Sequence, residues 1–248
     1  MKVISTLLTL QLLVSISPAQ EELVSEKLAV AGEPKQQYFL IHRVGKKSPE
    51  AGNKLLIVLP GGSGSADFNP FVTNIAKNAI GVDYVVAQLV SVKWTPDQGI
   101  IWPVKSSRVR GKKFSTEEYI EAVISDIKKT RKIDHEHIYT LSWSSGGPAA
   151  YQASLSLDEI KGSFVAMSVF QPDFLKGLKK AKGHRYYIYH SPDDPVCPYQ
   201  MAENAKEILM KNKAIVEFES YKGGHGWHGD IFGSLRKGFE WLEQRESN

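Results

Sequence analysis

Short apolar runs recur along the chain, and stretches with helical spacing separate them. An apolar run of about four to eight residues between turn signals is typical of a buried strand, whereas apolar residues about three or four positions apart indicate one face of a helix. This pattern predicts strands over 36–44, 55–59, 82–89, 138–142, 163–169, 185–190 and 214–221, and helices over 68–80, 115–131, 199–212 and 230–243, with another beginning at Pro148. Alternating strands and helices predict an α/β fold, in which helices cover both faces of a mostly parallel sheet.

The first part of the chain differs from the rest. Residues 1–19 hold a lysine, an apolar stretch and a small-residue end, which together predict a secretory signal cleaved before Gln20. The apolar stretch is too short for a comfortable membrane span, so we expect a secreted or periplasmic protein. Residues 20–35 are acidic and polar and predict a loose segment, which leaves 36–248 as a single domain.

The composition is that of an ordinary globular protein, with 42% hydrophobic and 23% charged residues and a net charge of +4. The single cysteine, Cys197, excludes an internal disulfide. Basic residues are densest over Lys105–Lys113, and no aromatic residues interleave with them, so no nucleic-acid partner is expected. Such a run can attract an anionic substrate or surface, although it is more often a solvated loop.

A serine stands where a predicted strand runs directly into a predicted helix. Residues 138–147, IYTLSWSSGG, carry the pattern G-x-S-x-G around Ser144, with Ser142 in place of the first glycine. In a nucleophile elbow, such a turn strains the serine backbone and lifts its hydroxyl above the sheet. Small neighbours are needed because the strand and the helix approach closely. Ser144 is therefore the candidate nucleophile.

Two further candidates follow Ser144 in the order Ser, Asp, His. Asp193 and Asp194 come after the predicted strand 185–190, and His225 lies among glycines after the last predicted strand. Each candidate stands where a strand ends and a loop begins, which is where open α/β sheets place their sites. The chain order is that of α/β-hydrolases and differs from the chymotrypsin and subtilisin orders.

From Tyr38 to about Glu243, the chain resembles serine esterases of the α/β-hydrolase superfamily. It is most similar to the phospholipase/carboxylesterase, dienelactone hydrolase, and feruloyl esterase or polyhydroxybutyrate depolymerase-like branches. The run HSPDDPVCP is similar to the family's acid loop, H-G-x-x-D-x-x-V-P, with Ser191 in place of glycine. This register assigns the family's acid to Asp194 and leaves Asp193 as a turn residue.

Two other segments carry the resemblance. Residues 223–227, GGHGW, are similar to the family's histidine loop. Residues 55–68, LLIVLPGGSGSADF, are similar to its oxyanion strand and loop, with Pro60 where histidine is common. The resemblance implies an α/β-hydrolase fold, a Ser-Asp-His triad and no metal or cofactor.

Each residue of the implied site has a chemical role. Ser144 would be the nucleophile and His225 its base, because a serine hydroxyl at neutral pH needs a proton acceptor beside it. Asp194 would hold the histidine tautomer and stabilise the imidazolium. The backbone amides of Ser145 and Gly62 would donate to the oxyanion.

Three tryptophans are candidates for contact with substrate. Trp143, Trp102 and Trp227 can line an acyl pocket or simply pack against the sheet, and the sequence leaves both options open. The stretch 94–114 has the prolines and glycines of a loop, so there is little chain from which to build a lid. We therefore expect a shallow site. Its substrate would be a small molecule, namely a short or water-soluble ester.

Two alternatives to an esterase remain open. The elbow and the acid loop also resemble catalytic domains of prolyl-oligopeptidase type, which would make the protein a serine peptidase. Ser142 and Pro60 depart from the family pattern, which keeps a non-catalytic binding protein with this fold in consideration. The pattern carries no information on the oligomeric state.

Overall fold

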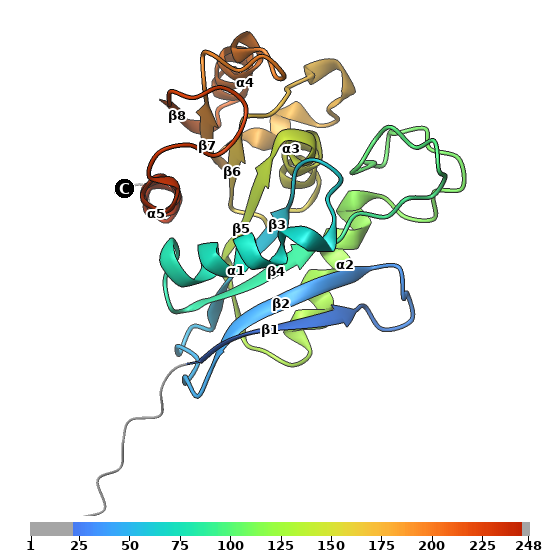
Figure 1. Ribbon diagram of the computed structural model, residues 1–248, viewed down its shortest axis with the longest axis vertical. Coiled ribbons are helices and arrows are strands. Elements are labelled where there is room, and N and C mark those ends of the chain that lie inside the picture. Colours follow the sequence, from blue (N-terminus) through green and yellow to red (C-terminus); the bar gives the residue numbers. More distant parts are fainter. Residues whose placement is uncertain (1–21, 245–248) are drawn as a thin grey trace, which may run out of the picture.

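The structure, a computed structural model, describes residues 22–244, and its strands form one eight-stranded sheet (Figure 1). The strand order across the sheet is β1-β2-β4-β3-β5-β6-β7-β8. The strands are β1 (Glu22–Ala29), β2 (Gln37–Val44), β3 (Asn53–Leu59), β4 (Tyr84–Leu89), β5 (Ile133–Trp143), β6 (Gly162–Ala166), β7 (Arg185–His190) and β8 (Ile215–Ser220). Strands β3 to β8 run parallel, and β2 is antiparallel to both of its neighbours. The carboxyl ends of β3 to β8 therefore share one edge.

Helices cover both faces of this sheet (Figure 1). The α-helices are α1 (Asn69–Asn78), α2 (Thr116–Lys128), α3 (Gly147–Ser156), α4 (Tyr199–Lys211) and α5 (Ile231–Leu242). Four short 3-10 helices accompany them: η1 (Ala66–Phe68), η2 (Ser144–Gly146), η3 (Pro172–Phe174) and η4 (Leu178–Ala181). Helices α1 and α5 share one apolar cluster with the sheet, whereas α2, α3 and α4 pack on clusters of the other face.

Strand β3 shows how one strand serves both faces. Leu56 and Val58 belong to the cluster with α1 and α5, and Leu55, Ile57 and Leu59 belong to the cluster with α2 and α3. All five are fully buried, because successive side chains of a central strand point to opposite, covered faces. The continuous apolar run in the sequence reflects this double burial.

The predicted fold class is confirmed, and the predicted loose segment 20–35 is wrong in part. Residues 22–29 form the edge strand β1, which pairs with β2 over its whole length. Polar contacts hold it there: Glu26 lies 2.9 Å from the His42 ring, and the Ser25 hydroxyl is 3.0 Å from the Asn69 amide nitrogen. An edge strand tolerates charged side chains, so the polar sequence of β1 carried no apolar pattern from which to predict a strand.

The predicted signal segment, residues 1–19, lies outside the described residues. Within residues 22–244, no helix has both the length and the apolar character needed to cross a bilayer. The stretch between β4 and α2 contains no helix or strand, as the sequence predicted for 94–114.

Helix α2 begins with a capping box at Ser115 and Glu118. The Ser115 hydroxyl accepts from the Glu118 amide at 3.3 Å, and the Ser115 amide donates to the Glu118 carboxylate at 2.7 Å. The Ser115 amide and the Ser115 hydroxyl, which donates to the Glu118 carboxylate at 2.9 Å, lower the pKa of Glu118. Two amides of the first turn, which have no partner within a helix, are thereby satisfied.

We expect Ser115→Ala to lower the free energy of unfolding by about 1 kcal/mol, because the Glu118 amide loses its acceptor. Urea unfolding followed by tryptophan fluorescence measures this change. Ser106→Ala, at an exposed position of the preceding loop, is the matched control and should leave the midpoint unchanged. Equal effects of the two substitutions would show that the cap contributes nothing.

Candidate active site

Ser144 occupies a strained turn at the carboxyl end of β5. The strand ends at Trp143, and the chain passes through η2 directly into α3. Ser144 has a φ of 50°, in the left-handed region that residues other than glycine rarely adopt. The Ser168 hydroxyl donates to the Ser144 carbonyl at 2.6 Å and so supports this conformation. The geometry is that of a nucleophile elbow.

The elbow lies close to its neighbours, and this explains the two glycines that follow Ser145. A Cβ added at Gly146 would overlap the carbonyl oxygen of Leu59 on β3. One added at Gly147 would overlap the Ser168 hydroxyl. Neither contact can be relieved by rotating a side-chain end, since the first is with backbone and the second also involves the Ser168 Cβ at 2.5 Å. The small residues of the motif are therefore required by this close approach.

Ser142 replaces the first glycine of the motif. Its side chain is fully buried between Leu59 of β3 and Val165 of β6, its partners in register. Its hydroxyl has no hydrogen-bond partner among the described residues. An unpaired buried polar group costs about 1–3 kcal/mol. Serine in place of glycine therefore lowers the stability of the packing beneath the elbow.

The loops after β5, β7 and β8 bring the three predicted side chains together. His225 Nε2 lies 3.1 Å from Ser144 Oγ, and His225 Nδ1 lies 2.8 Å from Asp194 Oδ2. The ionised carboxylate accepts only, so Nδ1 carries the ring proton and Nε2 is free to accept from the serine hydroxyl. Asp193 is exposed, and its own contact is a bond from its amide to Ser191.

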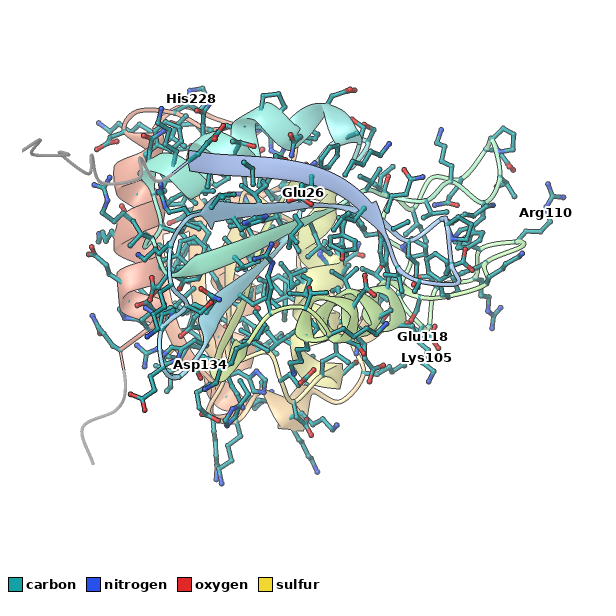
Figure 2. All side chains as sticks on the ribbon, turned by 90° about the horizontal axis from the view of Figure 1, so that it is seen from below. Glu26, Lys105, Arg110, Glu118, Asp134 and His228 are labelled. Carbon is teal, nitrogen blue, oxygen red and sulfur yellow. The ribbon has the colours of Figure 1, made fainter. Side chains whose placement is uncertain are left out.

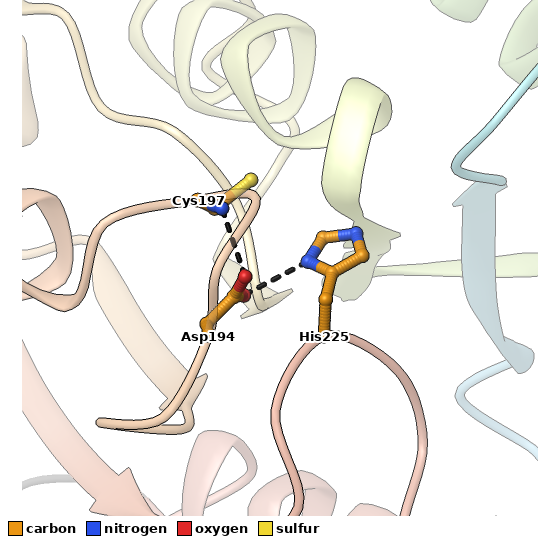
Figure 3. Close-up of side chains that lie close together, drawn as sticks. All are labelled: Asp194, Cys197 and His225. Atoms are coloured by element: carbon orange, nitrogen blue, oxygen red, sulfur yellow. Dashed lines mark hydrogen bonds and ion pairs between the residues drawn. The ribbon is translucent and has the colours of Figure 1, made fainter.

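Backbone amides hold the Asp194 carboxylate in place. Oδ1 accepts from the amides of Val196 and Cys197, both at 2.8 Å, while Oδ2 faces the His225 ring (Figure 3). Burial alone would raise the pKa of Asp194. The Cys197 amide, the His225 ring and the Val196 amide outweigh burial and hold this pKa below its ordinary value. Asp194 is therefore a carboxylate at neutral pH.

His190 is a further member of this cluster, to which the sequence analysis gave no role. It ends β7 and is buried; its Nε2 donates to the Cys197 carbonyl at 2.9 Å and lies 3.2 Å from Asp194 Oδ2. Burial lowers the pKa of His190, so its ring is neutral at neutral pH. The sequence did contain a signal for this role: His190 ends the predicted strand that leads into the acid loop.

Two other side chains support these loops: Ser191 joins the acid loop to the histidine loop, and Tyr221 acts within the histidine loop. The Ser191 hydroxyl accepts from the amides of Asp193 at 3.2 Å and Gly224 at 3.1 Å, one in each loop. The Tyr221 hydroxyl lies 3.0 Å from the Gly224 carbonyl and 2.8 Å from the Gly226 carbonyl, on either side of His225. Ser191 stands where the family has glycine, and here it links the loops.

The turn after β3 lies against the elbow. The Ser145 hydroxyl donates to the Gly62 carbonyl at 2.9 Å, and a Cβ at Gly61 would lie 2.9 Å from the Ser144 Cβ. Gly62 has a φ of 56°, which a residue with a side chain would adopt only under strain. The Ser145 amide belongs to the first turn of η2, where amides have no partner within the helix. Gly62 and Ser145, the residues predicted to supply the oxyanion donors, thus contact each other at the elbow.

The three tryptophans occupy different environments. Trp143 is 5% exposed and packs edge-to-face on Phe68 and Trp227. Trp102 is 4% exposed and donates to the Pro60 carbonyl at 2.9 Å. Both rings therefore pack beneath the turn after β3 and offer little surface to a substrate. Trp227 is half-buried and stays a candidate for substrate contact.

One group of residues within 22–244 combines metal-binding donor types. Donor atoms of Asp194, Cys197 and His225 lie within 4.8 Å of one another (Figure 3). Both carboxylate oxygens already accept hydrogen bonds, and burial raises the pKa of the Cys197 thiol to about 11. A metal here would have to displace the bond between Asp194 and His225, so the arrangement fits an acid–base pair better than a metal centre.

The lowered pKa of Asp194 gives a prediction for stability. A carboxyl group whose pKa falls on folding stabilises the fold at pH values above its unfolded pKa, near 3.8, and loses this effect as the pH falls through the folded pKa. Asp194→Asn should therefore destabilise the protein most at pH 6, with a difference that shrinks towards pH 3. Urea unfolding at several pH values measures it.

Asp193→Asn is the matched control for this experiment, because Asp193 is the adjacent residue and is exposed. We expect it to change the free energy of unfolding little at every pH. A difference for Asp194→Asn that stays constant between pH 6 and pH 3 would contradict the argument.

No protein-family model matches the chain, and no curated protein matches its sequence. Solved structures do match. A putative dienelactone hydrolase from Klebsiella pneumoniae aligns with a TM-score of 0.66 and 11% identity, over 90% of this chain and 100% of that chain. The Bacillus cereus carboxylesterase aligns with a TM-score of 0.59 and 17% identity, over 83% and 92%.

A third match is Thermogutta terrifontis esterase 2, phosphorylated by paraoxon, with a TM-score of 0.62 and 14% identity, over 88% of this chain and 92% of that chain. Identities this low are informative about fold alone. The structural neighbours are esterases and other hydrolases, and the chain has the α/β-hydrolase fold that its sequence predicted.

Proposed function

We propose that the protein is a serine hydrolase that cleaves carboxylic esters through an acyl-enzyme on Ser144. The observation that carries the proposal is the unbroken chain of contacts from Ser144 Oγ through the His225 ring to the buried Asp194 carboxylate. A nucleophile, a base and a group that orients the base, each within hydrogen-bond reach of the next, are what acyl transfer requires.

The reaction follows from these positions. His225 Nε2 takes the serine proton as Ser144 Oγ attacks the ester carbonyl, and Asp194 stabilises the resulting imidazolium. The amides of Ser145 and Gly62 donate to the tetrahedral oxyanion. Collapse expels the alcohol, which receives its proton from His225. Water then attacks the acyl-enzyme by the same route and releases the carboxylic acid.

The substrate is proposed to be a small or otherwise accessible ester rather than a long acyl chain. Between β4 and α2, the longest connection in the described part of the chain, there is neither a helix nor a strand that could form a cap. A site without a cap buries little of an acyl chain. Trp227, beside His225, is the side chain proposed to contact the substrate.

The test of this function is covalent labelling with a fluorophosphonate, which reacts with an activated serine. We expect labelling of the wild type and none of Ser144→Ala, whereas Ser145→Ala keeps the nucleophile and remains labelled. A folded wild type that stays unlabelled would favour a binding protein.

Asp194→Asn should lower kcat for a nitrophenyl ester by about 10⁴-fold, because the histidine tautomer is lost. Asp193→Asn should change kcat little.

The same samples separate an esterase from a peptidase. Nitrophenyl esters of increasing acyl length should be turned over faster when the acyl group is short. Amides that contain proline should be cleaved far more slowly than these esters. Faster cleavage of the amides would instead favour the peptidase.

We also propose that the protein is exported, on the strength of the signal pattern in residues 1–19. The amino-terminal sequence of the protein recovered after expression in a secreting bacterial host measures this. We expect it to begin at Gln20, in the periplasmic or extracellular fraction. An uncleaved protein in the cytoplasmic fraction would contradict export.

A further inference from the structure

The segment Lys105–Lys113 is a basic loop at the same edge of the sheet as Ser144. It lies in the connection that follows the carboxyl end of β4, and it projects from the body of the protein with Arg110 at its far end (Figure 2). Five cations fall within it, and there is no acidic residue between Asp97 and Glu117. A single-sign protrusion of this kind produces a local positive field.

One of the five cations holds the loop together. The Lys112 ammonium donates to the carbonyls of Val104 at 2.6 Å, Ser107 at 2.8 Å and Lys105 at 3.2 Å. Three acceptors within one short segment match the three donors of an ammonium group. Lys112 therefore stabilises the loop from within and gives it a defined shape.

Both ends of the loop are fixed to the rest of the protein. The amide and hydroxyl of Thr116 donate to the Pro103 carbonyl at 2.8 and 3.0 Å. On the amino-terminal side, the Trp102 ring donates to the Pro60 carbonyl and fills the space that a Cβ at Gly64 would need, so it supports the turn after β3. That turn touches Ser144 through Gly61. The loop is thus tied to the candidate site by two successive contacts.

The other cations face solvent. Arg108, Arg110 and Lys113 are exposed, and none of them forms an ion pair with a residue in the described range 22–244. Val109 between the arginines is only partly exposed, and the loop presents no strongly exposed large apolar side chain. Loops that dock on bilayers combine charge with apolar side chains that insert. The tip of this loop offers charge without them.

From this arrangement we propose that the Lys105–Lys113 loop docks an anionic polymer, namely an esterified acidic polysaccharide, and presents its ester groups to Ser144. The inference rests on the proposed esterase function and names its substrate class. Fixed cations on an open, convex surface suit a chain of repeated carboxylates, whereas a small anion is better held in an enclosed pocket. Attraction of this kind speeds encounter by about 10-fold or more and weakens with salt.

The test compares two variants with equal changes of charge. Arg108→Gln/Arg110→Gln/Lys113→Gln removes three of the four exposed cations of the loop and leaves Lys105 in place. Lys77→Gln/Lys206→Gln/Lys211→Gln removes three exposed cations from α1 and α4 and is the control. Circular dichroism establishes that both variants are folded.

Binding is measured first, because it needs no turnover. Retention on immobilised polygalacturonate at rising NaCl should be strong for the wild type and the control and about 10-fold weaker for the loop variant. Dextran, which is neutral, should retain none of them. Equal retention of the loop variant and the wild type would overturn the proposal. So would tighter binding of the wild type to phosphatidylglycerol vesicles than to the polymer, which would indicate a membrane surface.

Turnover is measured second, on acetylated polygalacturonate and on nitrophenyl acetate. The ratio of the two kcat/KM values should fall about 10-fold in the loop variant and stay constant in the control. In the wild type this ratio should decline with NaCl. An unchanged ratio would overturn the proposal even if the esterase function holds. Absence of turnover on both substrates, with salt-sensitive retention intact, would remove the esterase function and leave the docking surface.

Discussion

The close approach of the nucleophile elbow to strand β3 is the constraint on which the site depends. The Leu59 carbonyl leaves no space for a Cβ at Gly146, and the Ser168 hydroxyl leaves none at Gly147. Helix α3 begins at this contact, Ser144 beside it has a positive φ, and the turn after β3 lies against the serine. The parallel sheet positions the other two side chains. The loops after β7 and β8 emerge at the same edge of the sheet and place Asp194 and His225 there.

Support for Asp194 and His225 comes from both loops at once. Asp194 is held by amides of its own loop, the Ser191 hydroxyl joins that loop to the histidine loop, and Tyr221 fastens the carbonyls around His225. These bonds fix the orientation of groups that must keep their mutual distances to act together. The Ser191 bond to the Gly224 amide is the one of these that runs from one loop to the other.

The sequence was sufficient to predict the sheet, its helices and the three side chains that meet at the edge, because apolar periodicity and the strand-to-helix turn at Ser144 are local patterns. It failed where tertiary contacts decide. The edge strand β1 has a polar sequence and exists because β2 offers it partners. The burial of Trp102 and Trp143 depends on the turn after β3, which no local pattern describes. The roles of His190, Ser191 and Tyr221 depend on backbone groups that the folded loops bring to them, and no apolar or motif pattern in the sequence marks these contacts.

The backbone groups that hold the Asp194 carboxylate have a consequence for how this protein can evolve. Val196 and Cys197 hold the carboxylate with their amides, and Cys197 holds His190 with its carbonyl. Such atoms are common to nearly all residue types, so these bonds do not restrict the identity of either residue; at the exposed Val196 little else does, whereas the buried Cys197 requires a side chain of similar size. Proline is the exception, since it has no amide hydrogen to donate. A lineage descended from this protein could therefore replace its lone thiol without rebuilding the apparatus around it.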